Sequence, residues 1–142
     1  MKKLTVVEKA YAAAAIDGEG CIMIKHPSTR PTVFNLYVEI VNTDVRLVEF
    51  VQKRWGGSLS QHHEPIGSKR KPRWHLQIAA KNAMQLLKDV LPYLVLKKKQ
   101  AQWGIKFQSQ MRYWGSTPRP ASYIAFQHKA CSEVHKLNKR GR

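Results

Sequence analysis

Two carboxylates separated by one glycine, Asp17 and Glu19, directly follow a run of four alanines from Ala12 to Ala15. Alanine is the strongest helix former, and four in a row leave a helix surface without bulk that a second helix can approach closely. Carboxylate oxygen is the ligand that a hard cation such as Mg²⁺ prefers. The stretch therefore places two potential metal ligands beside a potential helix contact, although an acidic pair at a helix end is otherwise an ordinary solvated turn.

The nine residues from Ala12 to Gly20 resemble the signature motif of the LAGLIDADG homing endonucleases, in their single-motif, homodimeric type. The ending Ile-Asp-Gly-Glu-Gly is a familiar variant of that motif. In its first half, Ala12, Ala14 and Ala15 replace the family's leading Leu, its Gly and its second Leu. Small side chains at these positions still permit close packing of two such helices.

Two further segments extend the resemblance over roughly residues 5 to 110. The stretch Trp55-Gly56-Gly57-Ser58-Leu59 is similar to the turn into the family's third strand. The stretch Leu91-Pro92-Tyr93-Leu94, followed by Lys97, resembles the second helical segment, which begins at a proline and carries a lysine beyond the apolar turn. The three segments stand in the family's order along the chain.

The resemblance implies roles in a nuclease site for four residues. Glu19 is implied as the catalytic acid and as the ligand of a Mg²⁺ (or Mn²⁺) cofactor, with one copy from each of two subunits. Lys97 aligns with the family's active-site lysine, which stabilises charge on the phosphate or helps to polarise the attacking water; Lys97 to Lys99 would otherwise be a solvated basic face. Asn42 falls where many relatives hold a glutamine near the metal-bound water, and Arg46 falls in the region of a second basic contact.

The resemblance also implies that two motif helices, one from each chain of a homodimer, pack against each other. The sequence contains no internal repeat, so one chain supplies one motif helix. Asp17 is expected to cap a helix end or to bond backbone across that contact. The residues expected at the dimer interface are Ala12, Ala13, Ala14, Ile16 and Asp17.

The charge of the chain points to a polyanionic partner. Its 142 residues include 25 Lys and Arg against 9 Asp and Glu, a formal net charge of +16, and neutralising phosphates releases bound counterions. No apolar run approaches the ~20 residues that span a bilayer, and Glu8 and Lys9 interrupt the segment that imitates a secretory signal. The two cysteines, Cys21 and Cys131, form neither a metal motif nor a disulfide framework. We expect an intracellular protein, in the cytoplasm or an organelle of its host and not secreted.

Periodicity and capping residues predict an α+β order of elements. Helices are expected over about residues 5–17, from a capping box at Thr5 and Glu8, and over about 44–55. Strands are expected over about 22–25 and 35–40, from 58, and over about 73–78. A helix capped by Asn82 then precedes one that begins at Pro92, whose buried stripe is expected at Tyr93, Leu96, Trp103, Phe107 and Trp114.

This order matches the family's αββαββα core, a four-stranded antiparallel saddle sheet that binds DNA on one face and is covered by helices on the other. We expect residues 1–111 to form this endonuclease domain. Residues 112–142 lie outside the resemblance and are expected to add a helix over about 121–136 and a basic tail.

Polar side chains that alternate with apolar ones would lie on the uncovered face of the sheet. Base edges in the major groove carry distinct donor and acceptor patterns that such a face can read, although any half-exposed antiparallel sheet shows the same alternation. Lys69, Arg70 and Lys71 are assigned to phosphate contacts. The expected reading residues are Lys25, Asn35, Tyr37, Glu39, Ser58, Ser60, His62, Arg73, His75 and Gln77.

Together these observations favour a site-specific DNA endonuclease that acts as a homodimer. The resemblance implies a metal-dependent double-strand break in a long pseudo-palindromic site, with each subunit contacting one half-site. The alternative is a binding protein on the same fold, either an intron RNA maturase or a DNA-binding regulator without nuclease activity. A basic ribosome-associated protein would explain the charge but gives no reason for the acidic motif.

Overall fold

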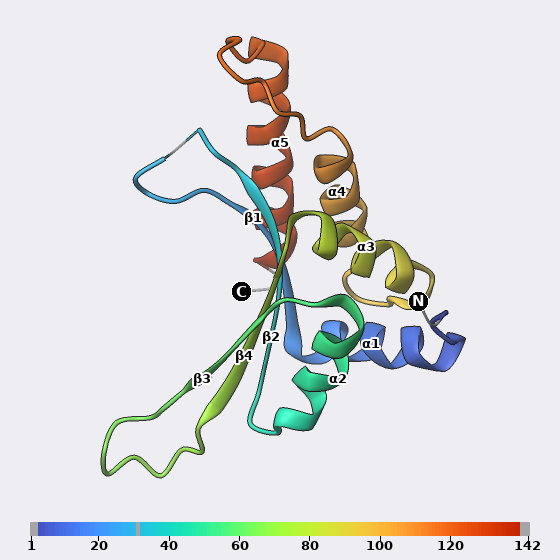
Figure 1. Ribbon diagram of the computed structural model, residues 1–142, viewed down its shortest axis with the longest axis vertical. Coiled ribbons are helices and arrows are strands. Elements are labelled where there is room, and N and C mark those ends of the chain that lie inside the picture. Colours follow the sequence, from blue (N-terminus) through green and yellow to red (C-terminus); the bar gives the residue numbers. More distant parts are fainter. Residues whose placement is uncertain (1–2, 31, 140–142) are drawn as a thin grey trace.

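The computed structural model describes residues 3–30 and 32–139. Two helix–strand–strand units are followed by further helices (Figure 1). Within the described ranges, no helix has the length and apolar character needed to cross a membrane. The elements are α1 (Val6–Glu19), β1 (Gly20–Lys25), β2 (Asn35–Asn42), α2 (Val45–Trp55), β3 (Ser58–His62), β4 (Arg73–Ala79), α3 (Ala80–Val90), the 3-10 turn η1 (Leu91–Tyr93), α4 (Lys98–Ser109) and α5 (Ala121–Asn138).

The four strands form one antiparallel sheet in the order β1-β2-β4-β3. Helices α1 to α4 lie on one side of this sheet, and the other side is left uncovered (Figure 1). The two hairpin loops, β1–β2 and β3–β4, lie at opposite ends of the sheet (Figure 1). The β1–β2 loop is contacted from α5 and the segment before it, where Arg119 donates to the Thr32 carbonyl at 2.8 Å and His128 packs edge-on against Phe34. The α+β fold with its αββαββα order is therefore confirmed.

The core lies between the sheet and its covering helices. Alternate strand residues point into it, which is the period-two pattern of a half-buried sheet. Helix α4 comes close to the sheet at Gly104, where an added Cβ would lie 2.9 Å from a methyl carbon of Leu36 and of Leu87. The fully buried side chains with the largest volumes are Phe107, Ile16, Ile22, Leu36, Ile40, Leu76, Ile78, Leu86, Leu87, Val38, Val48 and Val51.

Helix α1 begins and ends where the sequence predicts. The Thr5 hydroxyl accepts from the Glu8 N–H at 3.1 Å and the Glu8 carboxylate accepts from the Thr5 N–H at 2.7 Å, which completes a capping box. At the other end β1 starts at once with Gly20, where an added Cβ would lie 2.8 Å from Cα of Ile16. Only glycine permits this approach, and it fixes the direction in which the chain leaves Glu19.

Helix α5 covers the outer edge of the sheet along β1. Edge strands carry unpaired backbone groups that proteins usually protect. Here the Asn138 amide donates to the Ile22 carbonyl at 2.8 Å, and the Cys131 thiol donates to the Ile24 carbonyl at 3.0 Å. The α5 helix also packs against α4 and buries Val134 in the shared core. Residues 121–138 are thus part of the same packed body as the sheet.

The segment after Pro92 differs from its prediction. A single 3-10 turn, Leu91–Tyr93, is followed by an irregular stretch, and α4 begins only at Lys98. Leu96, expected in a buried stripe, is 51% exposed, and half-buried Trp114 lies beyond α4. The cause is Asp17, whose carboxylate accepts the backbone N–H groups of residues 95 to 97.

The start of α3 is also earlier than predicted. Strand β4 runs directly into this helix, whose cap is Ala79 and not Asn82. Ala80 takes a positive φ of 53° at this junction, because the chain turns from strand to helix there without a loop. Asn82 therefore lies in the first turn of α3.

Candidate active site and nucleic-acid interface

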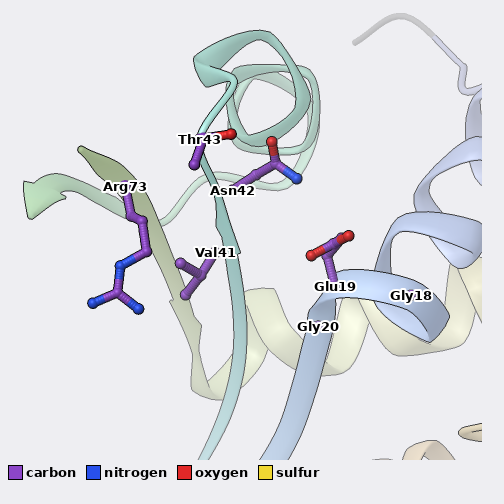
Figure 2. A pocket seen from close by; sticks show the side chains of 7 residues that line it. All are labelled: Gly18, Glu19, Gly20, Val41, Asn42, Thr43 and Arg73. Carbon is purple, nitrogen blue, oxygen red and sulfur yellow. The ribbon is translucent and has the colours of Figure 1, made fainter. Parts of the chain in front are cut away.

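A polar pocket of about 520 Å³ lies where α1 meets the ends of β2 and β4. Figure 2 shows the Glu19 carboxylate, at the end of α1, on the same side of β2 as the Asn42 side chain, whereas Val41 and Thr43 point to the other side of β2. All four residues line the pocket. Arg73, the first residue of β4, lines the opposite side, beyond β2. The structure thus brings Glu19 and Asn42 together, as expected, although they are separated by two strands in the sequence.

The side chain of Asn42 has a defined orientation. Its amide oxygen accepts the Asp44 N–H at 2.8 Å, and Figure 2 shows its nitrogen turned toward Glu19. The amide group therefore presents a hydrogen-bond donor to the pocket. A donor beside a carboxylate can bind a water molecule or a phosphate oxygen held there.

Arg46 lies in the first turn of α2 and does not line the pocket around Glu19. Its guanidinium donates to the Asp44 carboxylate at 2.6 Å, and its side chain is 86% exposed. The hydrogen bonds from the Arg46 side chain and backbone lower the pKa of Asp44 to about 2. Arg46 thus anchors the helix cap, and its expected role as a second basic contact of the site stays a prediction.

Asp17 and Lys97 hold the end of α1 to the start of α4. The Asp17 carboxylate accepts from the N–H groups of Val95, Leu96 and Lys97 at 2.7, 3.2 and 3.0 Å. In return the Lys97 ammonium donates to the carbonyls of Ile16 and Asp17 at 2.8 and 3.1 Å, and to that of Gly20. Asp17 thus binds the backbone of the irregular stretch before α4 within its own chain, and Lys97 lies behind the turn that carries Glu19.

The pocket offers a donor set that fits a hard divalent cation only in part. Mg²⁺ is usually held by one or two carboxylates together with substrate phosphates and water. Glu19 supplies one carboxylate, and in the described part of the chain no group of three or more His, Cys, Asp or Glu residues could hold a metal. Burial raises the pKa of the neighbouring Cys21 thiol, which disfavours the thiolate that a metal would need. A cation at Glu19 would need further ligands from DNA, water or a second chain.

Three of the five residues expected at the dimer interface face the chain's own core. Ala12, Ala13 and Ile16 have no exposed surface in the single chain, because this side of α1 packs on the sheet and α3. Their assignment to contact with a partner is therefore corrected. The open face of α1 carries residues at helical spacing, namely Val7, Tyr11, Ala14 and Gly18, which are all exposed.

The residues expected to read DNA alternate with the buried strand residues and so share the uncovered face of the sheet. They pair across neighbouring strands, for example Glu39 with Gln77 and Ser60 with His75. The charged run Lys69 to Lys71 is exposed in the β3–β4 loop. The arrangement is a polar face flanked by basic side chains, as a groove-binding sheet requires.

Glu39 is the acidic centre of this face. Its Oε1 accepts from Nε2 of Gln77 at 2.8 Å and from the Lys25 ammonium at 3.2 Å, while Nε2 of His75 lies 3.4 Å from Oε2. Partial burial raises the pKa of Glu39, but the donors Gln77 and Lys25 and the nearby positive charges outweigh it and leave the pKa below its ordinary value. The Lys25 ammonium also lies over the Tyr37 ring, 4.9 Å from its centre.

Sequence reasoning missed the pocket positions of Gly18, Val41 and Thr43, and it assigned Arg73 to DNA reading alone. Arg73 also forms an ion pair with Glu64 at 3.4 Å. Its place next to the pocket follows from the pairing of Asn42 with Trp74, which the sequence does not specify. Thr43 could have been predicted to line the pocket, because it lies in the sequence between Asn42 and Asp44, the cap of α2.

Solved structures of homing endonucleases share this fold. The I-CvuI homing endonuclease, in complex with the I-CreI target and Mg, matches with a TM-score of 0.73 and 17% identity over 96% of this chain and 84% of that chain. The archaeal intron-encoded homing endonuclease I-Vdi141I, complexed with DNA, matches with a TM-score of 0.69 and 12% identity over 96% and 87%. The LAGLIDADG homing endonuclease I-GzeII, in complex with its DNA target, matches with a TM-score of 0.57 and 13% identity over 94% and 44%.

At these identities the likeness establishes the fold, and it confirms the fold expected from the sequence motif. No protein-family model matches the sequence, and no curated protein matches it. Function must therefore be argued from the site.

Proposed function

We propose that this chain is a site-specific DNA endonuclease of the homing type. It acts as a homodimer on a long pseudo-palindromic site and makes a double-strand break there with Mg²⁺ or Mn²⁺. The observation that carries the proposal is the pocket in which the Glu19 carboxylate meets the Asn42 amide, at the margin of a polar sheet face on a strongly basic chain. Its fold is shared with homing endonucleases seen in complex with DNA. The proposal places the protein inside its host cell, where DNA is found.

Glu19 is the residue that would hold the divalent ion, together with oxygen ligands from DNA and water. When bound, such an ion offsets the charge that builds on the phosphate and lowers the pKa of its bound water. Glu19 is exposed at the end of a rigid helix, so its carboxylate is accessible to a phosphate. A carboxylate without a cation would repel DNA. Binding of a divalent ion would therefore explain why Glu19 lies on a DNA-binding surface.

Three other residues support the reaction in different ways. The amide nitrogen of Asn42 donates into the pocket and would orient a water molecule or a phosphate oxygen. Arg73 places a guanidinium on the far side of the same pocket, where it would neutralise a neighbouring phosphate. Lys97 is a positioning residue, because its ammonium binds the carbonyls of the turn from which Glu19 projects.

The homodimer is supported by what one chain lacks. One copy supplies a single carboxylate to the pocket, and cutting two strands requires two sites. Val7 and Tyr11, one turn apart on the open face of α1, are 77% and 49% exposed, and apolar side chains that are exposed side by side, unlike single ones, mark an interaction site. This chain spans 44% of the I-GzeII chain, so two copies would approach the length of that single protein.

Cleavage of a duplex DNA pool with a randomised central segment tests the proposal. We expect the wild-type chain with Mg²⁺ to cut a small set of related sequences on both strands, as read by sequencing the cut ends. EDTA should abolish cutting, and Glu19→Gln should reduce it by at least about a thousandfold while binding persists. Glu133→Gln is the matched control, because it removes one carboxylate from α5 and should leave cutting unchanged.

Binding of selected sequences without cutting by the wild-type chain would contradict the nuclease proposal. It would favour a DNA-binding regulator or, if the selected partner is structured intron RNA, a maturase. If the Glu19→Gln variant still cuts DNA, Glu19 takes no part in the reaction. Equal binding to all duplexes would leave only a basic protein without site specificity.

A further inference from the structure

The most unusual residue on the uncovered face is an anion placed where DNA would lie. Among the residues that the sequence assigned to base reading, Glu39 is the only carboxylate. It lies on β2, an inner strand of the sheet, and is contacted by Lys25 from β1 and by Gln77 and His75 from β4. A carboxylate that faces DNA is repelled by phosphates, and the Lys25 ammonium beside Glu39 offsets part of this repulsion.

The contacts of Glu39 hold its two oxygens differently. Oε1 accepts two hydrogen bonds, from Gln77 and Lys25, which fix the side chain. Oε2 faces Nε2 of His75 at 3.4 Å, which is longer than a good hydrogen bond. Since an ionised carboxylate has about four acceptor sites, Glu39 retains acceptor capacity toward the space above the sheet. Its carboxylate is an acceptor fixed in place before DNA arrives.

The edges of base pairs in the major groove determine what such an acceptor can meet. Only cytosine N4 and adenine N6 present donors there, whereas guanine and thymine present acceptors. Adenine carries its N7 acceptor directly beside N6, and this atom would repel the second carboxylate oxygen. Cytosine has no acceptor beside N4. A carboxylate therefore favours cytosine over adenine and opposes both other bases.

Lys25 extends the match to the second base of the pair. Its ammonium lies 3.2 Å from Glu39 Oε1, so the face presents a donor directly beside an acceptor. In a C·G pair, the N4 donor of cytosine lies one hydrogen bond, about 2.9 Å, from the O6 acceptor of guanine. Guanine N7 adds a second acceptor for the ammonium, whereas in an A·T pair the thymine methyl group would occupy that place.

We propose that the Glu39–Lys25 pair selects a C·G base pair in each half-site, with cytosine N4 bound by Glu39 and guanine O6 and N7 bound by Lys25. This inference rests on the proposed function and names part of its target sequence. Gln77 holds the carboxylate in position and is free to bind the next base through its own amide oxygen. The target of the wild-type chain should thus contain a cytosine that no other base replaces without loss of affinity.

Selection of bound duplexes from a randomised pool tests the inference separately from cleavage. The full chain is used in a Glu19→Gln background, so that selected DNA is bound and not cut, and is compared with the same chain carrying Glu39→Gln. We expect one position in each half-site to prefer C by about tenfold or more in the parent. With Glu39→Gln the preference at this position should change to A, because a glutamine amide pairs with N6 and N7 of adenine.

Glu39→Ala provides a second variant and Glu133→Gln a charge-matched control. Glu39→Ala should lose the preference for C without gaining one for A, and Glu133→Gln should retain the parental preference. Thermal unfolding followed by circular dichroism establishes that each variant is folded. Should one of the Glu39 variants fail to fold, the other still decides the question.

The inference is overturned if the selected sequence is the same with and without the Glu39 carboxylate. A uniform change in affinity for all sequences would also overturn it, since Glu39 would then act only through net charge. Selection of no sequence at all by the parent would remove the proposed function, and this inference with it. Binding without cleavage by the wild-type chain would leave the inference intact and remove only the nuclease activity.

Discussion

At the scale of single residues, the position of Glu19 depends on contacts that lie behind it. The Asp17 carboxylate and the Lys97 ammonium exchange hydrogen bonds with the backbone of each other's segment, and so tie the end of α1 to the chain before α4. Three backbone carbonyls accept hydrogen bonds from the ammonium, and one of them belongs to Gly20, the residue directly after Glu19. The geometry of the Glu19 carboxylate is thus set by residues that do not line its pocket.

Replacing Lys97 by methionine tests whether it is a positioning residue. The change leaves carbonyls of the turn without this donor, and an unsatisfied buried carbonyl costs about 1–3 kcal/mol. We expect the free energy of unfolding in urea to fall by that amount and cleavage to fall with it. Lys98→Met, the same change at the exposed neighbouring residue, should leave stability unaltered. A Lys97→Met chain of wild-type stability that no longer cuts would instead place Lys97 in direct contact with the phosphate.

The sequence predicted the residues of this site better than their contacts. The motif pointed to Glu19, and the comparison with the family's glutamine position pointed to Asn42. The structure places both residues in the same pocket. The partners of Asp17 could not be predicted, because they are backbone N–H groups 78 to 80 residues away that carry no side-chain signal. The inward direction of Ala12 and Ala13 was missed because alanine packs equally well on its own sheet and on a partner.

At the scale of elements, the strands and helices could be predicted from the periodicity of apolar residues, because each element has one buried face. The expectation was wrong where a single distant side chain decides the local structure, as it does between Pro92 and Lys98. The role of α5 was also beyond the sequence. Its helical pattern is visible, but nothing in the pattern shows that its polar side chains bind the edge carbonyls of β1.

A chain that ends at residue 111 tests whether α5 belongs to the folded core. Loss of residues 112–142 would uncover the β1 edge and the apolar surface of α4 against which Ala130 and Val134 pack. Exposed strand edges and apolar patches promote association, so we expect aggregation in gel filtration and no cooperative thermal transition. Deletion of residues 140–142 alone is the control and should preserve the transition.

The division of the chain at residue 111, into a domain and an extension, stays a prediction until this experiment. If the shortened chain melts at the same temperature as the full chain, α5 is an appendage and the division is correct. A less stable product that does not aggregate would place α5 in the core without an essential role in protecting the edge.

At the scale of the whole molecule, the basic charge and the pocket around Glu19 set opposite demands. A net charge of +16 favours association with any nucleic acid, whereas specific cutting of both strands would require a defined geometry of two pockets. The helices cover one face of the sheet, and the polar face remains open for a partner (Figure 1). The open side of α1 leads to Glu19, so a second chain packed there would bring a second pocket close to the first.

Replacing Ala14 by glutamate tests this arrangement of two chains. Ala14 is exposed between Tyr11 and Gly18 on the open face of α1, where a partner helix would bury an added carboxylate. An unpaired buried charge costs about 3–5 kcal/mol, so the dimer should weaken by more than about a hundredfold. Sedimentation should then show monomers, and double-strand cutting should be lost. Ala125→Glu, the same change on the exposed side of α5, should preserve both; an Ala14→Glu chain that remains dimeric would place the interface elsewhere.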